Sequence, residues 1–306
     1  MPASVAAGTS MQALRRAGLI VLFASGCAHG RHADTVATEE GRTAAKPAAR
    51  VLHDVPPAEL LARQPDEAEV LLRTSVARDH ALGPKLEPFV LAWPGWGKTL
   101  RRFTAHPLSE LDWIDIVGPR DPGKERLAVR TAADDAAIDA RLAASSDGSL
   151  RVATRPAPHL VTVVPPEAAG AVQEALRSAR VIDPAGPPDE GLRALLPHPH
   201  AFFRAIPEEA ESARLRVFAR PEGAVQAELE LSCSDVAAAS RVAASLREQA
   251  ERANGVFVRM LTHDLLSGLL IELDGRTARL VLPASRAQIE ALAALAAGLI
   301  PPEPAP

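Results

Sequence analysis

The chain has 306 residues, of which 47% are hydrophobic and 24% are charged, and its 34 basic and 38 acidic side chains give a net charge of −4. This length and composition allow a sizeable buried core, in one large domain or two small ones. The sequence shows no basic patch of the kind that a nucleic-acid-binding surface needs, so a nucleic-acid partner is not expected.

The N-terminus has the pattern of a secretory signal. Arg15 and Arg16 precede an apolar run over residues 17–25, and small residues follow it. A basic segment, a short apolar segment and small residues in this order are typical of a signal peptide. The apolar run is about half of the roughly 20 residues that cross a bilayer, so it makes a poor permanent anchor.

Residues 24–27 read Ala-Ser-Gly-Cys and resemble the lipobox of bacterial lipoproteins. In that family the signal peptide is cleaved before the cysteine. The cysteine sulfur then receives a diacylglycerol, and its new amino group is acylated, for example with palmitate. The resemblance implies cleavage between Gly26 and Cys27 and lipidation of Cys27. An ordinary signal peptide with a coincidental cysteine is the alternative.

Lipidation of Cys27 would place the protein on a membrane of the bacterial cell envelope, facing the periplasm. Each buried methylene of a lipid contributes about 0.8 kcal/mol, so two or three acyl chains hold a protein stably. Ala28 follows the cysteine. By resemblance to enteric sorting, a residue other than Asp at this position favours the outer membrane.

The remaining chain divides by composition. Residues 28–57 contain few large apolar side chains and no periodicity, which is typical of a flexible tether. The predicted organisation is a signal peptide over 1–26, a lipidated cysteine and tether over 27–57, a first α+β half over 58–183, a hinge or connector over 184–205, a second α+β half over 206–300, and a disordered tail over 301–306.

The first half alternates predicted strands and helices. Apolar periodicity predicts strands over 69–76, 112–117, 126–131, 150–154 and 159–164, and helices over 82–93, from Asp134 or Asp135 through Leu142, and over 167–179. Pro166 suits the first position of the last of these helices.

The second half has a similar order. Strands are predicted over 214–220, 225–232 and 255–262, and as a hairpin over 269–284 that turns at Asp274-Gly275. A long helix follows Ser234 or Asp235 and runs to about residue 252, and Ser285 caps a closing helix. We therefore predict an α+β fold of two similar halves, each an antiparallel sheet with helices packed on one face, produced by internal duplication.

Residues 92–99, AWPGWGKT, fit the loose phosphate-binding pattern of a small residue, four spacers and Gly-Lys-Ser/Thr. Such a loop needs a strand before it and slim spacers with free amides. Here the preceding residues follow a helical pattern, and Trp93 and Trp96 are among the spacers. We therefore reject nucleotide binding through Lys98 and Thr99 and predict a turn whose tryptophans pack on its apolar side.

Three side chains remain as candidates for chemistry. His198 and His200 are two residues apart in a Pro-rich stretch and could bind zinc or copper, but no third ligand lies at familiar spacing, so a metal is not expected. Cys233 alternates with Leu229 and Leu231, which places its side chain on the apolar face of a strand. A buried, inert thiol is the favoured interpretation, and no cofactor is expected.

Enzyme signatures such as G-x-S-x-G, H-E-x-x-H and S-x-x-K are missing from the sequence. The favoured hypothesis is a lipid-anchored envelope protein whose non-catalytic domain binds or scaffolds an unknown envelope protein or ligand. The alternative is a hydrolase-like envelope enzyme with a site in the cleft between the halves, using His198, His200 or a nearby acid.

Overall fold

The computed structural model describes residues 53–80, 83–92, 96–101, 104, 106–118, 124–144 and 152–297. The predicted signal peptide, Cys27, most of the predicted tether and the predicted tail lie outside the described residues. No helix in the described residues is both long enough and apolar enough to cross a membrane.

The first half of the chain contains the predicted strands together with several short helices. Its elements are β1 (His53–Val55), α2 (Pro57–Leu60), β2 (Ala68–Leu72), α3 (Thr74–Asp79), α4 (Gly83–Ala92), α5 (Trp96–Leu100), α6 (Pro107–Glu110), β3 (Leu111–Gly118), β4 (Arg126–Thr131), α7 (Asp135–Ala144), β5 (Val152–Ala157), β6 (Leu160–Val164), α8 (Pro166–Ser178) and β7 (Ala179–Val181).

The second half contains longer strands and one long helix. Its elements are β8 (Glu190–Pro197), η1 (Pro199–Ala201), β9 (Ala210–Ala219), η2 (Pro221–Gly223), β10 (Val225–Cys233), α9 (Val236–Ala253), α10 (Val256–Leu261), η3 (Leu265–Gly268), β11 (Leu270–Asp274), β12 (Thr277–Ala284) and α11 (Arg286–Ala297).

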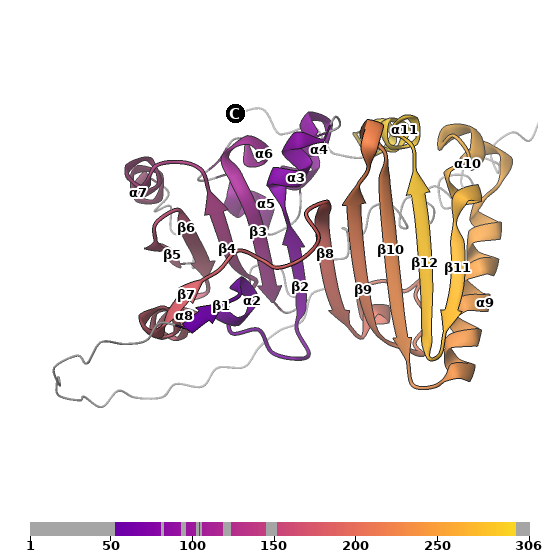
Figure 1. The fold of residues 1–306 in the computed structure, drawn as a ribbon, viewed down its shortest axis with the longest axis horizontal. Helices are drawn as coiled ribbons and strands as arrows, with labels where there is room; N and C mark the ends of the chain where they lie inside the picture. The colour runs from indigo at the N-terminus through magenta and orange to yellow at the C-terminus, as the bar shows by residue number, and fades with distance from the viewer. Residues whose placement is uncertain are drawn as a thin grey trace, which may run out of the picture.

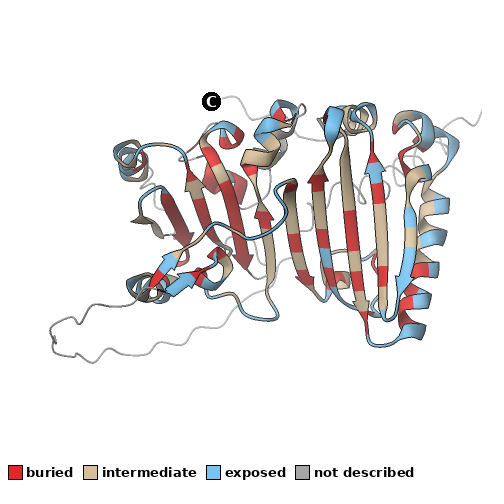
Figure 2. Cartoon of the chain, in the orientation of Figure 1, coloured by how far each residue is buried: buried red, intermediate tan, exposed pale blue. Residues whose placement is uncertain are grey.

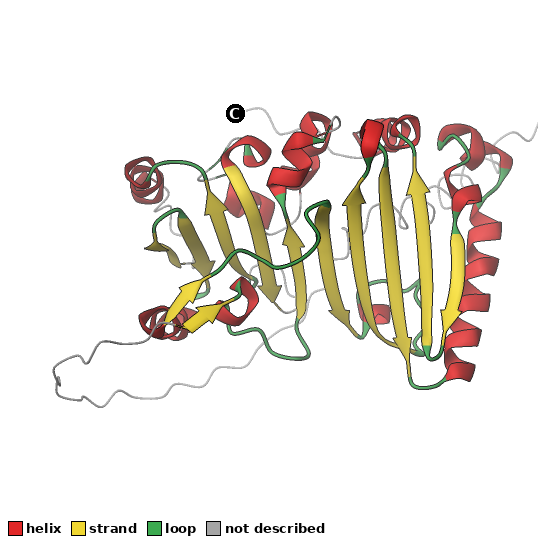
Figure 3. Cartoon of the chain, viewed as in Figure 1, coloured by secondary structure: helices red, strands yellow, loops and turns green. Residues whose placement is uncertain are grey.

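Ten of the strands form one antiparallel sheet (Figures 1 and 3). Their order is β11-β12-β10-β9-β8-β2-β3-β4-β6-β5, while β1 and β7 form a separate parallel pair. The α+β class is confirmed. The two halves do not form separate sheets, because β2 and β8 pair antiparallel along the middle.

The strand order supports an internal duplication. On one side of the central pair the order is β2-β3-β4-β6-β5, and on the other it is β8-β9-β10-β12-β11. In each half three neighbouring strands are followed along the chain by a helical segment, a hairpin and a last helix, and the antiparallel pairing of β2 with β8 joins the two halves. Strand β8, the first strand of the second half, is not among the predicted strands.

The back face of the sheet is covered by helices along its whole length. We define this face by the side chains of Ile114, Leu215 and Leu231, which point to the same side because alternate residues of paired strands share a face. In the first half it packs against α5 and α7. In the second half α9, η3 and α11 cover it.

The front face carries the alternate side chains, including those of Asp115, Arg216 and Glu228. In the first half α2 and α8 cover it, with the buried Leu60 and Val172 packed on β3, β4 and β6. In the second half no described helix lies over it, and Figure 1 looks directly onto the bare strands β8–β12.

The difference between the front faces arises from the last helix of each half. Helix α8 packs on the front of the sheet, whereas α11 packs on the back, with Ile289 and Leu292 against Leu282 and Ala284. Figure 2 shows buried and intermediate residues along β8 and β10 and mostly exposed residues along β11. The prediction of helices on one face therefore fits the second half, and the first half is covered on both faces.

The Pro-rich segment predicted as a hinge is instead a strap across the front of β2 and β3. Arg73 donates hydrogen bonds to the carbonyls of Pro184 and Pro187, at 2.6 and 2.7 Å. The indole Nε1–H of Trp113 donates to Asp183 at 3.0 Å. Strand β8 then begins inside the predicted connector over 184–205, so this region joins the halves into one sheet.

The predicted helix caps and the predicted hairpin turn are confirmed. Asp235 accepts a hydrogen bond from the amide of Ala238 at 2.8 Å and caps α9, and Ser285 and Gln288 exchange bonds at the start of α11. The hairpin turns at Gly275, whose φ is +56°, with Asp274 paired to Thr277. The two helix starts and the turn therefore follow from residues that are close together in the sequence.

Two strand predictions are wrong in part or in whole. The strand predicted over 69–76 ends at Leu72, because Thr74 begins α3 and its buried hydroxyl donates to the carbonyl of Leu111 at 2.6 Å. The strand predicted over 255–262 is helix α10. Alternation of apolar residues over so few positions is ambiguous, and β11 rather than this segment pairs with β12.

Candidate functional site

The front face of β8–β12, called the open face below, is the most distinctive surface of the described residues. Cross-strand register places Arg193, Arg216 and Glu228 in one row across β8, β9 and β10. The neighbouring row contains Leu195, Arg214, Glu230 and Arg279 across β8, β9, β10 and β12. An antiparallel sheet with one face packed and the other polar is a common arrangement, so the open face needs no covering helix to be stable.

Ion pairs connect the strands of the open face. Glu228 lies 3.0 Å from Arg216 and 3.1 Å from Arg279, and Arg216 also contacts Glu230 at 3.0 Å. Burial raises the pKa of Glu228. Hydrogen bonds from Arg279 and Gln226 and the nearby guanidinium charges together lower it by more, so the pKa of Glu228 is below its ordinary value. Opposite charges on paired strands favour this register.

An aromatic ring extends the charged surface toward one end of the sheet. The guanidinium carbons of Arg216 and Arg220 lie 5.4 and 5.1 Å from the centre of the Phe218 ring. Arg220 also forms an ion pair with Asp189. These contacts hold both arginines in place by cation–π attraction and by charge.

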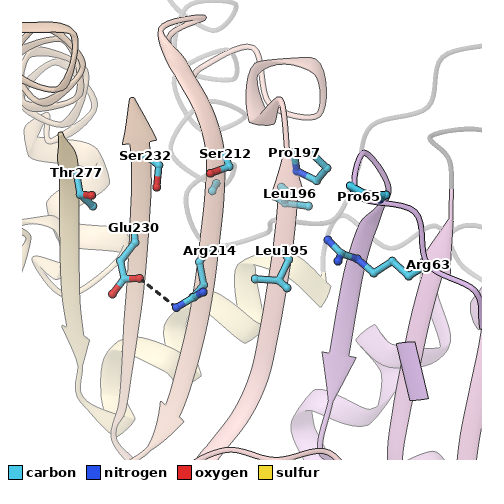
Figure 4. A pocket seen from close by; sticks show the side chains of 11 residues that line it. Arg63, Pro65, Leu195, Leu196, Pro197, Ser212, Arg214, Glu230, Ser232 and Thr277 are labelled. Carbon is cyan, nitrogen blue, oxygen red and sulfur yellow. Dashed lines mark ion pairs between the residues drawn. The ribbon is translucent and has the colours of Figure 1, made fainter. Parts of the chain in front are cut away.

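A groove of about 320 Å³ crosses the other end of the open face (Figure 4). One side is the row of Leu195, Arg214 and Glu230. The other side is a row of Pro197, Ser212, Ser232 and Thr277, which are directly paired across β8, β9, β10 and β12. Arg63 and Pro65, from the segment before β2, close the end nearest the first half.

A buried carboxyl group lies where the open face meets the covered part of the front face. Asp115 on β3 is only 2% exposed, and its Oδ1 has no hydrogen-bond partner. Burial, followed by the charge of Glu69, raises its pKa to about 8, although Arg193 and Arg63 act in the opposite direction. Perturbed carboxyl groups of this kind often mark functional sites.

The predicted metal candidates do not form a metal site. His198 is exposed and has a positive φ of 51°, whereas His200 uses Nδ1 to contact the carbonyl of Ile206 at 2.6 Å and Nε2 to approach Glu208 at 3.3 Å. Neither histidine lines the groove. The described part of the chain contains no group of three or more His, Cys, Asp or Glu side chains arranged to hold a metal ion.

The phosphate-loop resemblance lacks the required structural setting. Helix α4, not a strand, precedes it, and α5 is only five residues long. Trp96 is 5% exposed and packs in the core beside Leu100, and Thr99 is also buried. Trp93 and the Lys98 side chain lie outside what the structure describes.

Cys233 is fully buried at the end of β10, as predicted. Burial, together with nearby carboxylates, raises the pKa of its thiol. Because the thiolate is the reactive form, this environment makes Cys233 inert. Gly26 and Cys27, the predicted cleavage and lipidation residues, lie outside the described residues.

Sequence reasoning missed the open face, although the alternation that forms it is visible. Arg214 and Arg216 alternate with apolar residues on one strand, and Glu228 and Glu230 do so on the next. These pairs indicated polar strand faces. What the sequence did not show was that these faces are adjacent and that α11 leaves them uncovered.

No protein-family model matches the sequence, and a search of curated proteins finds no match. Among solved structures, crystal form I of TP0453 is similar over 79% of this chain and 98% of that chain, with 12% sequence identity and a TM-score of 0.43. At this level of similarity, the function has to be argued from the residues of this chain.

Proposed function

We propose that the chain is a lipid-anchored protein of the bacterial cell envelope, held on the outer membrane through Cys27, and that its folded domain binds a partner without catalysis. The anchor part of the proposal rests on Arg15, Arg16, the apolar run over 17–25 and the lipobox-like residues 24–27. The binding part rests on the open face.

The observation that carries the binding role is the difference between the two halves. In the first half α2 and α8 cover the front of the sheet, but in the second half the same face carries ordered charged side chains and a groove. Charged groups arranged in a fixed register provide specificity and orientation to an incoming partner. A covered face could not make these contacts.

The hydrolase-like alternative has less support. It required His198 or His200 to meet a carboxylate in a cleft between the halves. His200 does approach Glu208, but that carboxylate side chain is 82% exposed, and neither histidine lines the groove. The halves meet along the paired strands β2 and β8.

The anchor is tested by metabolic labelling with radioactive palmitate in a bacterial host. We expect the wild-type chain to incorporate label and to sediment with membranes, and the Cys27→Ala variant to incorporate none and to remain in the aqueous fraction. Equal labelling and sedimentation of the two proteins would show that Cys27 is not the anchor.

The binding face is tested by affinity capture from cross-linked envelopes. Ser232→Arg places a bulky charge in the groove, whereas Ser240→Arg makes the same change on the exposed side of α9, behind the sheet. We expect Ser240→Arg to capture the same proteins as the wild type and Ser232→Arg to lose them. Capture by Ser232→Arg at the wild-type level would rule out the open face as the binding surface.

A further inference from the structure

Two arginines that face the groove have guanidinium groups without hydrogen-bond partners among the described residues. Arg63 approaches Glu69 through Nε at 3.4 Å, but this atom makes no hydrogen bond. Arg214 approaches Glu230 at 3.8 Å, which is beyond hydrogen-bond distance. Each guanidinium carries five N–H donors, so the groove contains many unused donors.

Other arginines of the same face donate hydrogen bonds within the described residues, while the Nε atoms of Arg193 and Arg216 have no partner there. Arg216 donates to Glu228 and Glu230, each at 3.0 Å. Arg193 donates to the carbonyl of Ala185 at 3.1 Å. Arg63 and Arg214 differ from them because no hydrogen bond from either guanidinium joins it to another described residue.

The groove also provides apolar surface beside these donors. Figure 4 shows Arg63 and Arg214 on either side of Leu195, with Pro65 and Pro197 near the Arg63 end. Its charged lining consists of two arginines and one glutamate, and Glu230 is already paired with Arg216. The groove thus places the unused N–H donors of two ion-paired guanidinium groups next to an apolar floor.

We propose that this groove binds a carboxylate carried by a short apolar chain. A guanidinium matches the two oxygens of a carboxylate in a bidentate, charge-assisted pair, and the guanidinium groups of Arg63 and Arg214 on either side of Leu195 each offer such a pair. The apolar chain lies on Leu195 and the two prolines. This inference deepens the proposed function, because it names the chemistry recognised by the open face.

The test uses the full chain carrying Cys27→Ala, with hexanoate and hexanol as probes. Binding is followed by the methyl resonances of Leu195 and by calorimetry. We expect hexanoate to bind at least about tenfold more tightly than hexanol, because the alcohol lacks the charge that the guanidinium groups recognise. Equal affinity for the acid and the alcohol would overturn the proposal.

Three variants assign the binding to the two arginines. We expect Arg63→Gln and Arg214→Gln each to weaken hexanoate binding severalfold, and the double variant to reduce it to the level of hexanol. Arg252→Gln on α9, whose side chain is 65% exposed, should bind hexanoate as the wild type does. Unchanged binding by a folded double variant would also overturn the proposal.

A peptide that ends in leucine, compared as free acid and C-terminal amide, distinguishes the source of the carboxylate. Tighter binding of the free acid than of hexanoate assigns the groove to a partner's C-terminus, and tighter binding of hexanoate assigns it to a small acid. If neither acid binds while Ser232→Arg still abolishes envelope capture, the ligand chemistry is wrong and the proposed binding face stands.

Discussion

Asp115 makes the stability of the folded chain depend on pH. Burial, and then the charge of Glu69, raises the pKa of this carboxyl group from 3.8 to about 8, against the opposing charges of Arg193 and Arg63. The folded protein therefore keeps a proton that the unfolded chain releases above about pH 4. The contribution of protonated Asp115 to the stability of the fold is fully present below the pKa of this group in the unfolded chain, and it is lost as the pH rises toward 8.

The Asp115→Asn variant removes this titration while preserving the size of the side chain. A single proton changes the free energy of unfolding by at most about 1.4 kcal/mol per pH unit within this window. Between about pH 5 and pH 7, we therefore expect the wild type to lose up to about 2.7 kcal/mol relative to Asp115→Asn. Urea denaturation followed by tryptophan fluorescence at several pH values measures this difference.

Asp112→Asn is the matched control, because Asp112 is on the same strand but its side chain is 40% exposed. We expect its pH dependence to follow that of the wild type. The reasoning would be refuted if Asp115→Asn and the wild type changed in parallel between pH 5 and pH 7, because Asp115 would then titrate alike in the folded and unfolded chains.

Three further predictions concern the core, the cap of α9 and the buried thiol. Leu231 is fully buried and Leu273 is 46% exposed, so urea denaturation should show Leu231→Ala losing about 2–5 kcal/mol and Leu273→Ala less than about 1 kcal/mol; similar losses would contradict this difference in burial. Asp235→Ala removes the cap on the amide of Ala238 and should cost about 1 kcal/mol in the same assay, and no loss would exclude the cap. The thiol of Cys233 should react with a water-soluble disulfide reagent only in denaturant, and rapid reaction of the folded chain would contradict its burial.

The sequence was most informative where structure depends on neighbouring residues. The Asp235 and Ser285 caps, the turn at Gly275 and the proline that opens α8 each act within a few residues, so their positions could be predicted. The matching order of elements also indicated the duplication. These signals need no knowledge of tertiary contacts.

The missed features depend on contacts between distant segments. Strand β8 lies in a stretch whose prolines suggested a connector, and it forms a strand because β2 and β9 pair with its two edges. The strap is fixed by Arg73, which is more than 100 residues away in sequence from its carbonyl partners. The choice of face by α8 and α11 likewise depends on packing, so the open face could not be predicted from sequence periodicity.

The most direct test of the binding role is site-specific photo-cross-linking in intact cells. A photoreactive amino acid replaces Ser232 in the groove or Ser240 on α9, in the chain that retains Cys27. We expect irradiation to give a discrete adduct of higher mass at position 232 and none at position 240. No adduct at position 232, or the same adducts at both positions, would contradict partner binding through the open face.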